Sequence, residues 1–199
     1  MQQSKIYRYI MKIFFDTEFT GLHKDTTLIS IGLVDGDGRT FYAEFSDYDE
    51  SQVDNWILEN VISHLKLACT PRTGPVINIY ENNWEVYGDK AQVKDVLKDW
   101  LSKYDIVQLV SDVCHYDMVL FIDIFGSAFD LPKNVCPFCY DINHDIAELC
   151  VISDAEAFDK SREELCYRDI EGYKHNALYD AKVIKEIYSY CHPDEILYS

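Results

Sequence analysis

Residues 12–45 read KIFFDTEFTGLHKDTTLISIGLVDGDGRTFYAEF, and this stretch decides the fold. Three runs in it are rich in aromatic and β-branched side chains, which is typical of strands: residues 12–19, 27–34 and 39–45. Residues 35–38, Asp-Gly-Asp-Gly, carry strong turn chemistry between the second run and the third. We therefore expect the second and third strands to form an antiparallel hairpin.

The remainder of the chain alternates helical and strand-like patterns. Five segments have apolar residues at helical spacing: 53–65, 89–104, 116–125, 142–150 and 176–190. Residues 105–110 (DIVQLV) have the composition of a buried strand. Strands that open as a meander and then alternate with helices indicate one α/β domain, residues 11–199, with a mixed central sheet flanked by helices. Residues 1–10 precede the first strand, and we expect this N-terminal extension to be poorly ordered.

The composition is that of a folded domain, but its charge is unusual for a protein that binds nucleic acid. The chain has 199 residues, of which 48% are hydrophobic, enough for a substantial core. Its 18 Lys and Arg face 35 Asp and Glu, which gives a net charge of -17. Sequence-independent affinity for phosphate comes mainly from Lys and Arg. Binding of nucleic acid would therefore depend strongly on a metal site.

Three further features concern the compartment. The 7 Cys do not form the pattern of a secreted disulfide framework. Lys5, Arg8 and Lys12 interrupt any apolar stretch near the start, so no signal peptide is visible. The longest apolar runs, such as residues 118–122, are too short to span a bilayer. We predict a soluble protein of a reducing compartment, the cytoplasm.

Asp16 and Glu18 are two residues apart at the end of an apolar strand. The two-residue period of a strand places both carboxylates on one face of the sheet. Such carboxylates repel each other unless a cation lies between them, and oxygen ligands of this kind suit Mg²⁺. The alternative is an exposed strand end with two solvated acids, because the D-x-E pattern alone is weak.

Three other candidate residues lie far along the chain. Asp117 opens an apolar helix after the strand at residues 105–110, where an ordinary acid is also favoured by the helix dipole. Asp180 lies beside the apolar stripe of the last helix, which leaves it near the core boundary. His175 is five residues earlier, in the loop that enters this helix, a position where a histidine is more often a surface residue. Each of these signals is weak alone.

Together the motifs resemble one known family. FFDTEFTGL (residues 14–22), CHYDMVLF (residues 114–121) and HNALYDA (residues 175–181) are similar to the three exonuclease motifs of the DEDD superfamily. The H-x4-D spacing resembles its histidine (DEDDh) branch, which includes proofreading exonucleases, RNase T and oligoribonuclease. The resemblance covers residues 11 to about 190 and implies an RNase H-like exonuclease fold. The first motif and LISIGLVDGDGRTFYAEF look most like RNase AS, a 3′→5′ exoribonuclease that acts on adenylate-rich RNA.

The resemblance implies a chemistry for these residues. Asp16, Glu18, Asp117 and Asp180 would hold two Mg²⁺ ions, ~3.5–4 Å apart, for which Mn²⁺ would substitute. His175 would deprotonate the attacking water. The implied reaction is the hydrolysis of RNA from its 3′ end to nucleoside 5′-monophosphates.

Five more residues are expected to contact the substrate. By resemblance, Phe19, Thr20 and Gly21 would contact the terminal nucleotide through ring stacking and backbone groups. Core packing explains Phe19 equally well. Arg168 and Lys174 precede His175 and are the candidate phosphate contacts, although both could be solvated partners of nearby acids.

The second motif departs from the family. Many relatives have His-Asn or a similar pair near its start, whereas this chain has Ser111-Asp112-Val113-Cys114-His115-Tyr116. Asp117 fits the ligand position because an aromatic-Asp pair is followed by apolar residues. Asp112 remains open as an outer residue of the metal site or a substrate contact.

Alternative functions and sites follow from the same residues. An exodeoxyribonuclease shares the chemistry, because discrimination depends on contacts to the 2′-hydroxyl. A non-catalytic protein that binds partners through its acidic surface is a third reading. The resemblance also implies a homodimer. A zinc site is not assigned, since the C-x2-C-x4-H-x5-C spacing is one residue longer than a CCHC knuckle; its residues would be Cys136, Cys139, His144 and Cys150.

Overall fold

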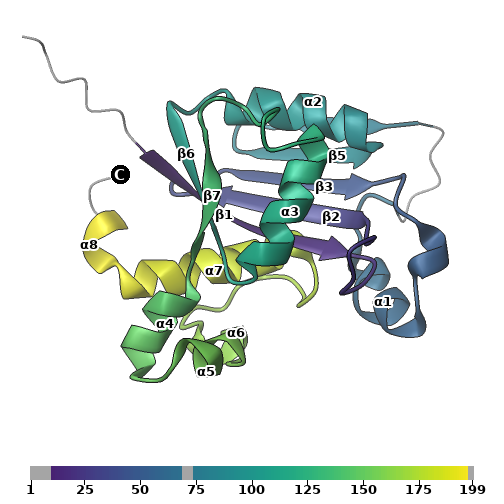
Figure 1. Cartoon of the computed structure of the whole chain (residues 1–199). Helices are drawn as coiled ribbons and strands as arrows, with labels where there is room; N and C mark the ends of the chain where they lie inside the picture. The colour runs from purple at the N-terminus through teal and green to yellow at the C-terminus, as the bar shows by residue number, and fades with distance from the viewer. Residues whose placement is uncertain (1–9, 69–73, 197–199) are drawn as a thin grey trace, which may run out of the picture.

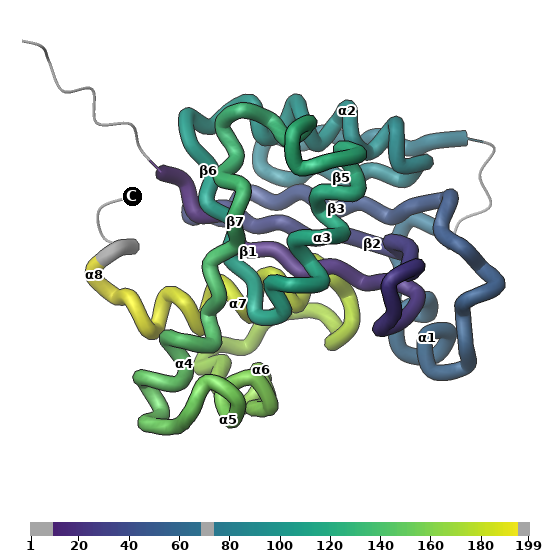
Figure 2. Tube along the Cα trace, in the orientation of Figure 1, coloured from purple at the N-terminus to yellow at the C-terminus, as the bar shows by residue number. Residues whose placement is uncertain are grey.

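The computed structural model describes residues 10–68 and 74–196. Within this part the chain forms a seven-stranded mixed sheet with helices on both faces, shown as a cartoon in Figure 1 and as a tube in Figure 2. The predicted extension at residues 1–10 lies, except for Ile10, outside the described residues.

The sheet has the strand order β4-β5-β3-β2-β1-β6-β7. Its strands are β1 (Ile10–Phe19), β2 (Leu28–Asp35), β3 (Thr40–Phe45), β4 (Val76–Ile79), β5 (Asn83–Gly88), β6 (Ile106–Ser111) and β7 (Val135–Asp141). β2 pairs antiparallel with β1 and with β3, and β4 pairs antiparallel with β5. β6 pairs parallel with β1 and with β7, and β3 pairs parallel with β5. The mixed sheet and the β2–β3 hairpin are thus confirmed.

The helices are α1 (Asn55–Asn60), α2 (Lys90–Leu101), α3 (Cys114–Phe125), α4 (Asn143–Cys150), α5 (Asp154–Phe158), α6 (Arg162–Leu165), α7 (Ala177–Cys191) and α8 (Pro193–Ile196). The five helices that the apolar spacing predicts are present, and α2, α3, α4 and α7 have nearly the predicted bounds. The predicted helix at 53–65 is shorter, because α1 passes into a 3₁₀ turn at Ile62–His64. The sequence patterns did not predict β4, β5, β7, α5, α6 or α8.

Adjacent residues of β1 bury their side chains on opposite faces of the sheet. Phe15 joins the core beneath α2 and α3, where it meets Phe121 edge-on. Phe14 joins a second core beneath α7 and packs against Tyr188. Figure 1 shows α7 lying across one face of the sheet and α3 across the other. The end of β1 therefore lies between two helices that each bring side chains to it.

Gly32 on β2 brings α7 into direct contact with the sheet. A Cβ at this position would lie 2.3 Å from the backbone nitrogen of Leu178 and 2.4 Å from the carbonyl oxygen of Ala177. Only glycine permits this approach, because both obstructing atoms are backbone. Gly32 also pairs with Asp16 of β1. The contact therefore fixes the first turn of α7 next to the strand that carries Asp16 and Glu18.

Candidate active site

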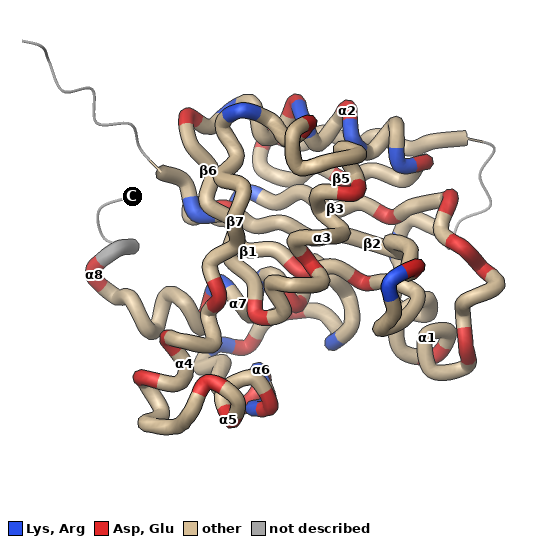
Figure 3. Tube along the Cα trace, viewed as in Figure 1, with Lys and Arg blue, Asp and Glu red and all other residues tan. Residues whose placement is uncertain are grey.

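The predicted acids and His175 converge at one cleft of about 580 Å³. Its lining includes Asp16 and Glu18 from β1, Asp117 from α3 and Asp180 from α7, together with His175. Figure 3 shows acidic positions on β1, α3 and α7 around this place, with few Lys or Arg among them. Side chains separated by more than a hundred residues thus meet at the end of β1.

The first group of close ligand atoms comprises Asp16, Asp112 and Asp117, one atom from each within 4.8 Å of the others. Asp117 lies in the first turn of α3 and is 1% exposed. The hydroxyl of Thr17 donates to its Oδ1 at 2.6 Å, and the hydroxyl of Ser111 donates to its Oδ2. Both oxygens of this carboxylate therefore have fixed partners from the strands beside it.

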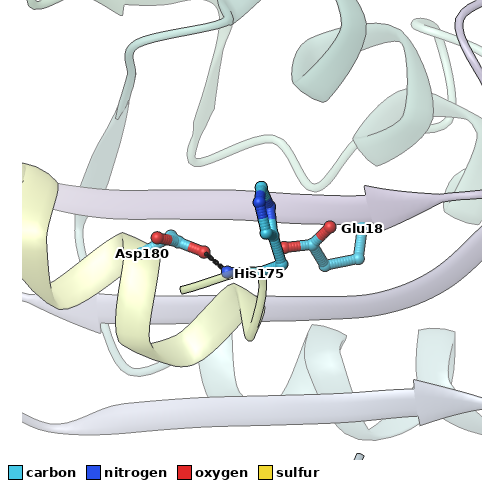
Figure 4. Close-up of side chains that lie close together, drawn as sticks. All are labelled: Glu18, His175 and Asp180. Atoms are coloured by element: carbon cyan, nitrogen blue, oxygen red, sulfur yellow. Dashed lines mark hydrogen bonds between the residues drawn. The ribbon is translucent and has the colours of Figure 1, made fainter. Parts of the chain in front are cut away.

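The second group comprises Glu18, His175 and Asp180, again with one ligand atom from each within 4.8 Å. Figure 4 shows the three side chains together, with the backbone N–H of His175 donating to Oδ2 of Asp180 at 2.8 Å. His175 has a φ of 62°, in the left-handed region that non-glycine residues seldom adopt. The loop thus adopts a strained conformation that places the imidazole beside the acids.

The electrostatics of the four carboxylates indicate that they lack countercharge. Removal from water, followed by repulsion between neighbouring acids, raises the pKa values of Asp16 and Glu18 well above their usual range. Burial also raises the pKa of Asp117 to about 7 and that of Asp180 to about 7, despite the hydrogen bonds that each accepts. Carboxylates held so close are stabilised in their charged form by divalent cations. The donor set therefore fits Mg²⁺ or Mn²⁺.

β1 divides its two acids between the groups, with Asp16 in one and Glu18 in the other. Among the described residues, these are the two groups of at least three His, Cys, Asp or Glu side chains close enough to hold an ion. A pair of adjacent oxygen-rich positions is the arrangement that two-metal sites require. The sequence had left Asp112 open, and the structure places it with the first group.

The environment of His175 suits a group that accepts protons. Burial lowers the pKa of its imidazole, with a further lowering by Lys174. The ring meets the indole of Trp56 edge-on, with centroids 5.0 Å apart. A histidine of lowered pKa is neutral at physiological pH and so retains a free lone pair.

The predicted substrate residues divide into those at the cleft and those away from it. Phe19 and Lys174 line the cleft, and the ring of Phe19 also stacks on Tyr116 at 5.3 Å. Thr20 is 2% exposed, and its hydroxyl is bonded within the loop that follows β1, where it accepts from the N–H of Thr27. Gly21 is not among the cleft residues and adopts a φ of 155°.

Arg168 lies at a different hollow, where its Nε is 3.1 Å from Glu186 of α7. The structure therefore does not bring it to the carboxylates. The short helices α5 and α6 instead supply the cleft wall that the sequence patterns missed, including Phe158, Lys160 and Arg162. No local periodicity marks these residues as neighbours of the acids.

Arg162 fixes Asp112 in place. Its Nε donates to Oδ2 of Asp112 at 2.7 Å, and its Nη2 donates to Oδ1 of Asn143 at 2.7 Å. Its Nη1 donates to the backbone carbonyls of Ala157 and Lys160. Four N–H groups of the guanidinium thus tie the α5–α6 segment to Asp112 and Asn143, and the ion pair explains why an acid is tolerated at position 112.

A second network supports the loop that carries His175. Glu44 is 1% exposed and accepts from the backbone N–H groups of residues 66–68 and from the hydroxyl of Tyr42 at 2.9 Å. The Nδ2 of Asn176 donates to the same hydroxyl at 3.2 Å. Asn176 caps α7 and directly follows His175, since its side chain accepts from the N–H of Tyr179. The buried carboxylate of Glu44 is thus connected through the side chain of Tyr42 to Asn176, the residue next to His175.

No helix in the described part of the chain is long and apolar enough to cross a bilayer. This finding agrees with the absence of long apolar runs in the sequence.

Comparisons with known proteins agree with this geometry. Residues 77–192 match the family model of the 3′-5′ exoribonuclease Rv2179c-like domain. The chain is 27% identical over 134 residues to the 3′-5′ exoribonuclease Rv2179c of Mycobacterium tuberculosis. The aligned region covers 66% of this chain and 71% of that protein.

Two solved structures are similar in fold. One is the nuclease domain of 3′hExo, a DEDDh family member bound to rAMP, with a TM-score of 0.61 and 17% identity over 96% of this chain and 95% of that one. The other is S. pombe Pop2p in its Mg²⁺- and Mn²⁺-bound form, with a TM-score of 0.60 and 15% identity over 92% and 83%. These matches confirm the predicted RNase H-like exonuclease fold.

Proposed function

Because the chain belongs to the family of the 3′-5′ exoribonuclease Rv2179c-like domain, we propose that it removes nucleotides one at a time from the 3′ end of RNA. The product would be a nucleoside 5′-monophosphate. The observation that carries the proposal is the division of the acids into two adjacent groups, with one acid of β1 in each and His175 in the second.

We assign cation binding to Asp16, Glu18, Asp117 and Asp180, with Asp112 beside the first group. Divalent cations bound there supply positive charge that polarises the scissile phosphate and stabilises its developing negative charge. The four carboxylates lie close together without balancing positive charge from the protein, and the pKa values of Asp117 and Asp180 are raised accordingly. Mg²⁺ and Mn²⁺ both suit such an oxygen donor set.

His175 acts as the general base in this proposal. Its pKa is lowered, so the imidazole is neutral near pH 7 and takes a proton from the attacking water. Its backbone N–H donates to Asp180, which couples the position of the ring to a carboxylate of the site. Lys174 lines the cleft one residue earlier and would contact a phosphate of the RNA. Its Nζ lies 3.2 Å from the carboxylate of Glu163.

Phe19 lines the cleft, and this position supports a contact between its ring and the terminal nucleotide. Its ring stacks on that of Tyr116, which helps to hold Phe19 in its position at the cleft. Stacking of a base on an aromatic ring is worth ~1–3 kcal/mol and tolerates any base. Such stacking compensates for the scarcity of Lys and Arg in a chain with a net charge of -17.

The test compares RNA and DNA oligomers of one sequence, each labelled at its 5′ end so that successive loss of 3′ nucleotides gives a ladder. With Mg²⁺ or Mn²⁺ we expect a single-nucleotide ladder from RNA and slower shortening of DNA. The variant Asp117→Asn is the control for contaminating nucleases. DNA shortened as fast as RNA would favour the exodeoxyribonuclease, and no cleavage of either would favour a non-catalytic binding protein.

Two statements stay predictions from the sequence. We propose that the chain forms a homodimer, by resemblance to RNase T, oligoribonuclease and RNase AS, and that it acts in the cytoplasm. Sedimentation equilibrium tests the first statement, and a monomeric mass over the micromolar range would contradict it.

A further inference from the structure

Two cysteines lie in contact next to the first group of acids. The Sγ of Cys114 is 2.9 Å from the Sγ of Cys139, although 25 residues separate them in sequence. Cys114 is the first residue of α3, and Cys139 lies on β7 opposite Leu109 of β6. Both are free thiols of residues with intermediate exposure.

This contact does not follow from the C-x2-C spacing of β7. Cys136 lies on the same strand, three residues before Cys139, but the pairing of β7 with β6 is irregular between Val135 and Cys139. The sulfur in contact with Cys139 is that of Cys114 on α3. Two carbonyls also lie near Cys114, since its Sγ is 3.2 Å from the oxygen of Tyr140 and 3.4 Å from that of Ser111, and its single S–H can donate to one of them.

We propose that Cys114 and Cys139 are a site of reversible oxidation, at which a peroxide joins them in a disulfide that weakens cation binding at the first group. One thiol reacts with hydrogen peroxide to give a sulfenic acid and water. The second thiol then attacks the sulfenic sulfur, forms the S–S bond and releases a second water. Two thiols and one peroxide thus give one disulfide and two waters, and a dithiol reductant reverses the change.

The geometry favours this pair because little movement is needed. A disulfide has an S–S bond of about 2.05 Å, so the sulfurs must approach by less than about 1 Å from their present contact. β7 is held in the sheet by its parallel pairing with β6. The movement therefore falls mainly on the first turn of α3.

The same turn carries Asp117, three residues after Cys114. Its Oδ2 accepts from the hydroxyl of Ser111, whose carbonyl is itself a partner of Cys114. Ligand distances in metal sites tolerate changes of only about 0.2 Å. A shift of the first turn toward β7 therefore alters the position of Asp117 relative to Asp16 on β1 and lowers the affinity for the cation.

The experiment uses the full chain, first reduced and then treated with a small excess of hydrogen peroxide. Thiols that remain are alkylated, and linked peptides are identified by mass spectrometry. Mn²⁺ affinity is then measured by calorimetry, a readout that does not need substrate. Cys139→Ser removes the pair, and Cys136→Ser is the matched control on the same strand.

We expect the wild type and Cys136→Ser to give a peptide that links Cys114 to Cys139, and Cys139→Ser to give none. In the two linked proteins Mn²⁺ affinity should fall several-fold and recover on reduction, while Cys139→Ser should show no change. A disulfide that closes a loop restricts the unfolded chain, so the linked proteins should also unfold at higher temperature.

Two results would overturn the proposal: oxidation of these thiols to sulfinic acid without a link, or a linked protein with unchanged Mn²⁺ affinity. Only the predicted loss of affinity rests on the proposed function. Failure of the RNA assay with normal cross-linking would count against the nuclease, not against the disulfide.

Discussion

The two groups of ligand atoms are built in different ways. In the first group, Asp117 is 1% exposed and both its oxygens accept from hydroxyls of neighbouring strands, while Arg162 fixes Asp112. In the second group, His175 lies in a loop with a φ of 62° and the bond from its backbone to Asp180 joins the loop to α7. The first group is preformed by the sheet, whereas the second depends on how a strained loop is held.

This difference suits the two groups to different tasks: cation binding in the first and proton transfer in the second. A carboxylate braced by two hydroxyls is suited to hold a cation at a fixed place, because its rotamer cannot relax. A base in a loop at the mouth of the cleft is suited to adjust as substrate binds. Variants of the two groups should therefore fail in different measurements.

The largest effect is expected from Asp117→Asn. The amide keeps the shape but removes the charge and turns one acceptor into a donor that faces the hydroxyls of Thr17 or Ser111. We expect kcat to fall by about 10³-fold or more, with loss of Mn²⁺ binding in calorimetry. If Asp117→Asn retained normal Mn²⁺ affinity, the first group would not be the preformed cation site that distinguishes it from the second.

His175→Ala tests the other group. We expect kcat to fall by about 10²–10⁴-fold, as for other general bases, while RNA affinity and Mn²⁺ affinity stay close to wild type. The acid limb of the pH profile of kcat should disappear as well, because the lowered pKa of His175 defines it. Full activity across neutral pH would exclude His175 as the base.

Removal of cations should reveal the unbalanced carboxylates. The folded pKa values of Asp117 and Asp180 are raised to about 7, whereas an unfolded Asp titrates near 4, so between these pH values the folded state binds more protons. The free energy of unfolding of the metal-free protein should therefore fall as pH rises from about 4 to about 7, by on the order of 2–4 kcal/mol.

Thermal unfolding with EDTA and with saturating Mg²⁺ measures this effect across that pH range. Mg²⁺ should stabilise the protein much more at pH 8 than at pH 5, because it binds the charged carboxylates. An equal stabilisation by Mg²⁺ at both pH values would show that these carboxylates are not the groups that bind Mg²⁺.

The smallest effect is expected from Tyr42→Phe. This change removes the hydroxyl that joins Glu44 to Asn176, and so loosens the loop of His175 without touching the first group. We expect a loss of about 1 kcal/mol in stability and a fall in kcat of about 5–10-fold, with KM little changed.

Tyr104→Phe provides the matched control. Its hydroxyl also donates to a buried carboxylate, that of Asp35 at 2.9 Å, but far from His175. A similar loss of stability with normal kcat is expected. If both variants lose kcat equally, the network from Glu44 has no specific role in positioning the base.

The parts of the molecule that the sequence predicted well are those with local signals. The Asp-Gly-Asp-Gly turn and the flanking apolar runs predicted β2 and β3, and apolar spacing predicted α2, α3 and α7 within a few residues. Asp16, Glu18, Asp117, His175 and Asp180 were predicted from the resemblance of their motifs, and the cleft brings them together. Each motif is recognised by residue types at fixed separations along the chain, so its residues could be identified without knowledge of the tertiary structure.

The missed parts depend on contacts that no local pattern records. β7 contains a proline and little alternation, so its place beside β6 is set by parallel pairing alone. The ion pair of Arg162 with Asp112 joins residues 50 positions apart. Arg168 was chosen for its nearness to His175 in sequence, but the chain turns it toward Glu186.

The missing side chain at Gly32 has a further consequence. Backbone atoms of the first turn of α7 rest on β2, so the spacing between the two elements is limited by peptide groups that cannot change their size. Asp180 lies in the same first turn, so its separation from β1 depends on this backbone contact. Even one added methyl group at position 32 would push this turn off the sheet and move Asp180 away from Asp16 and Glu18.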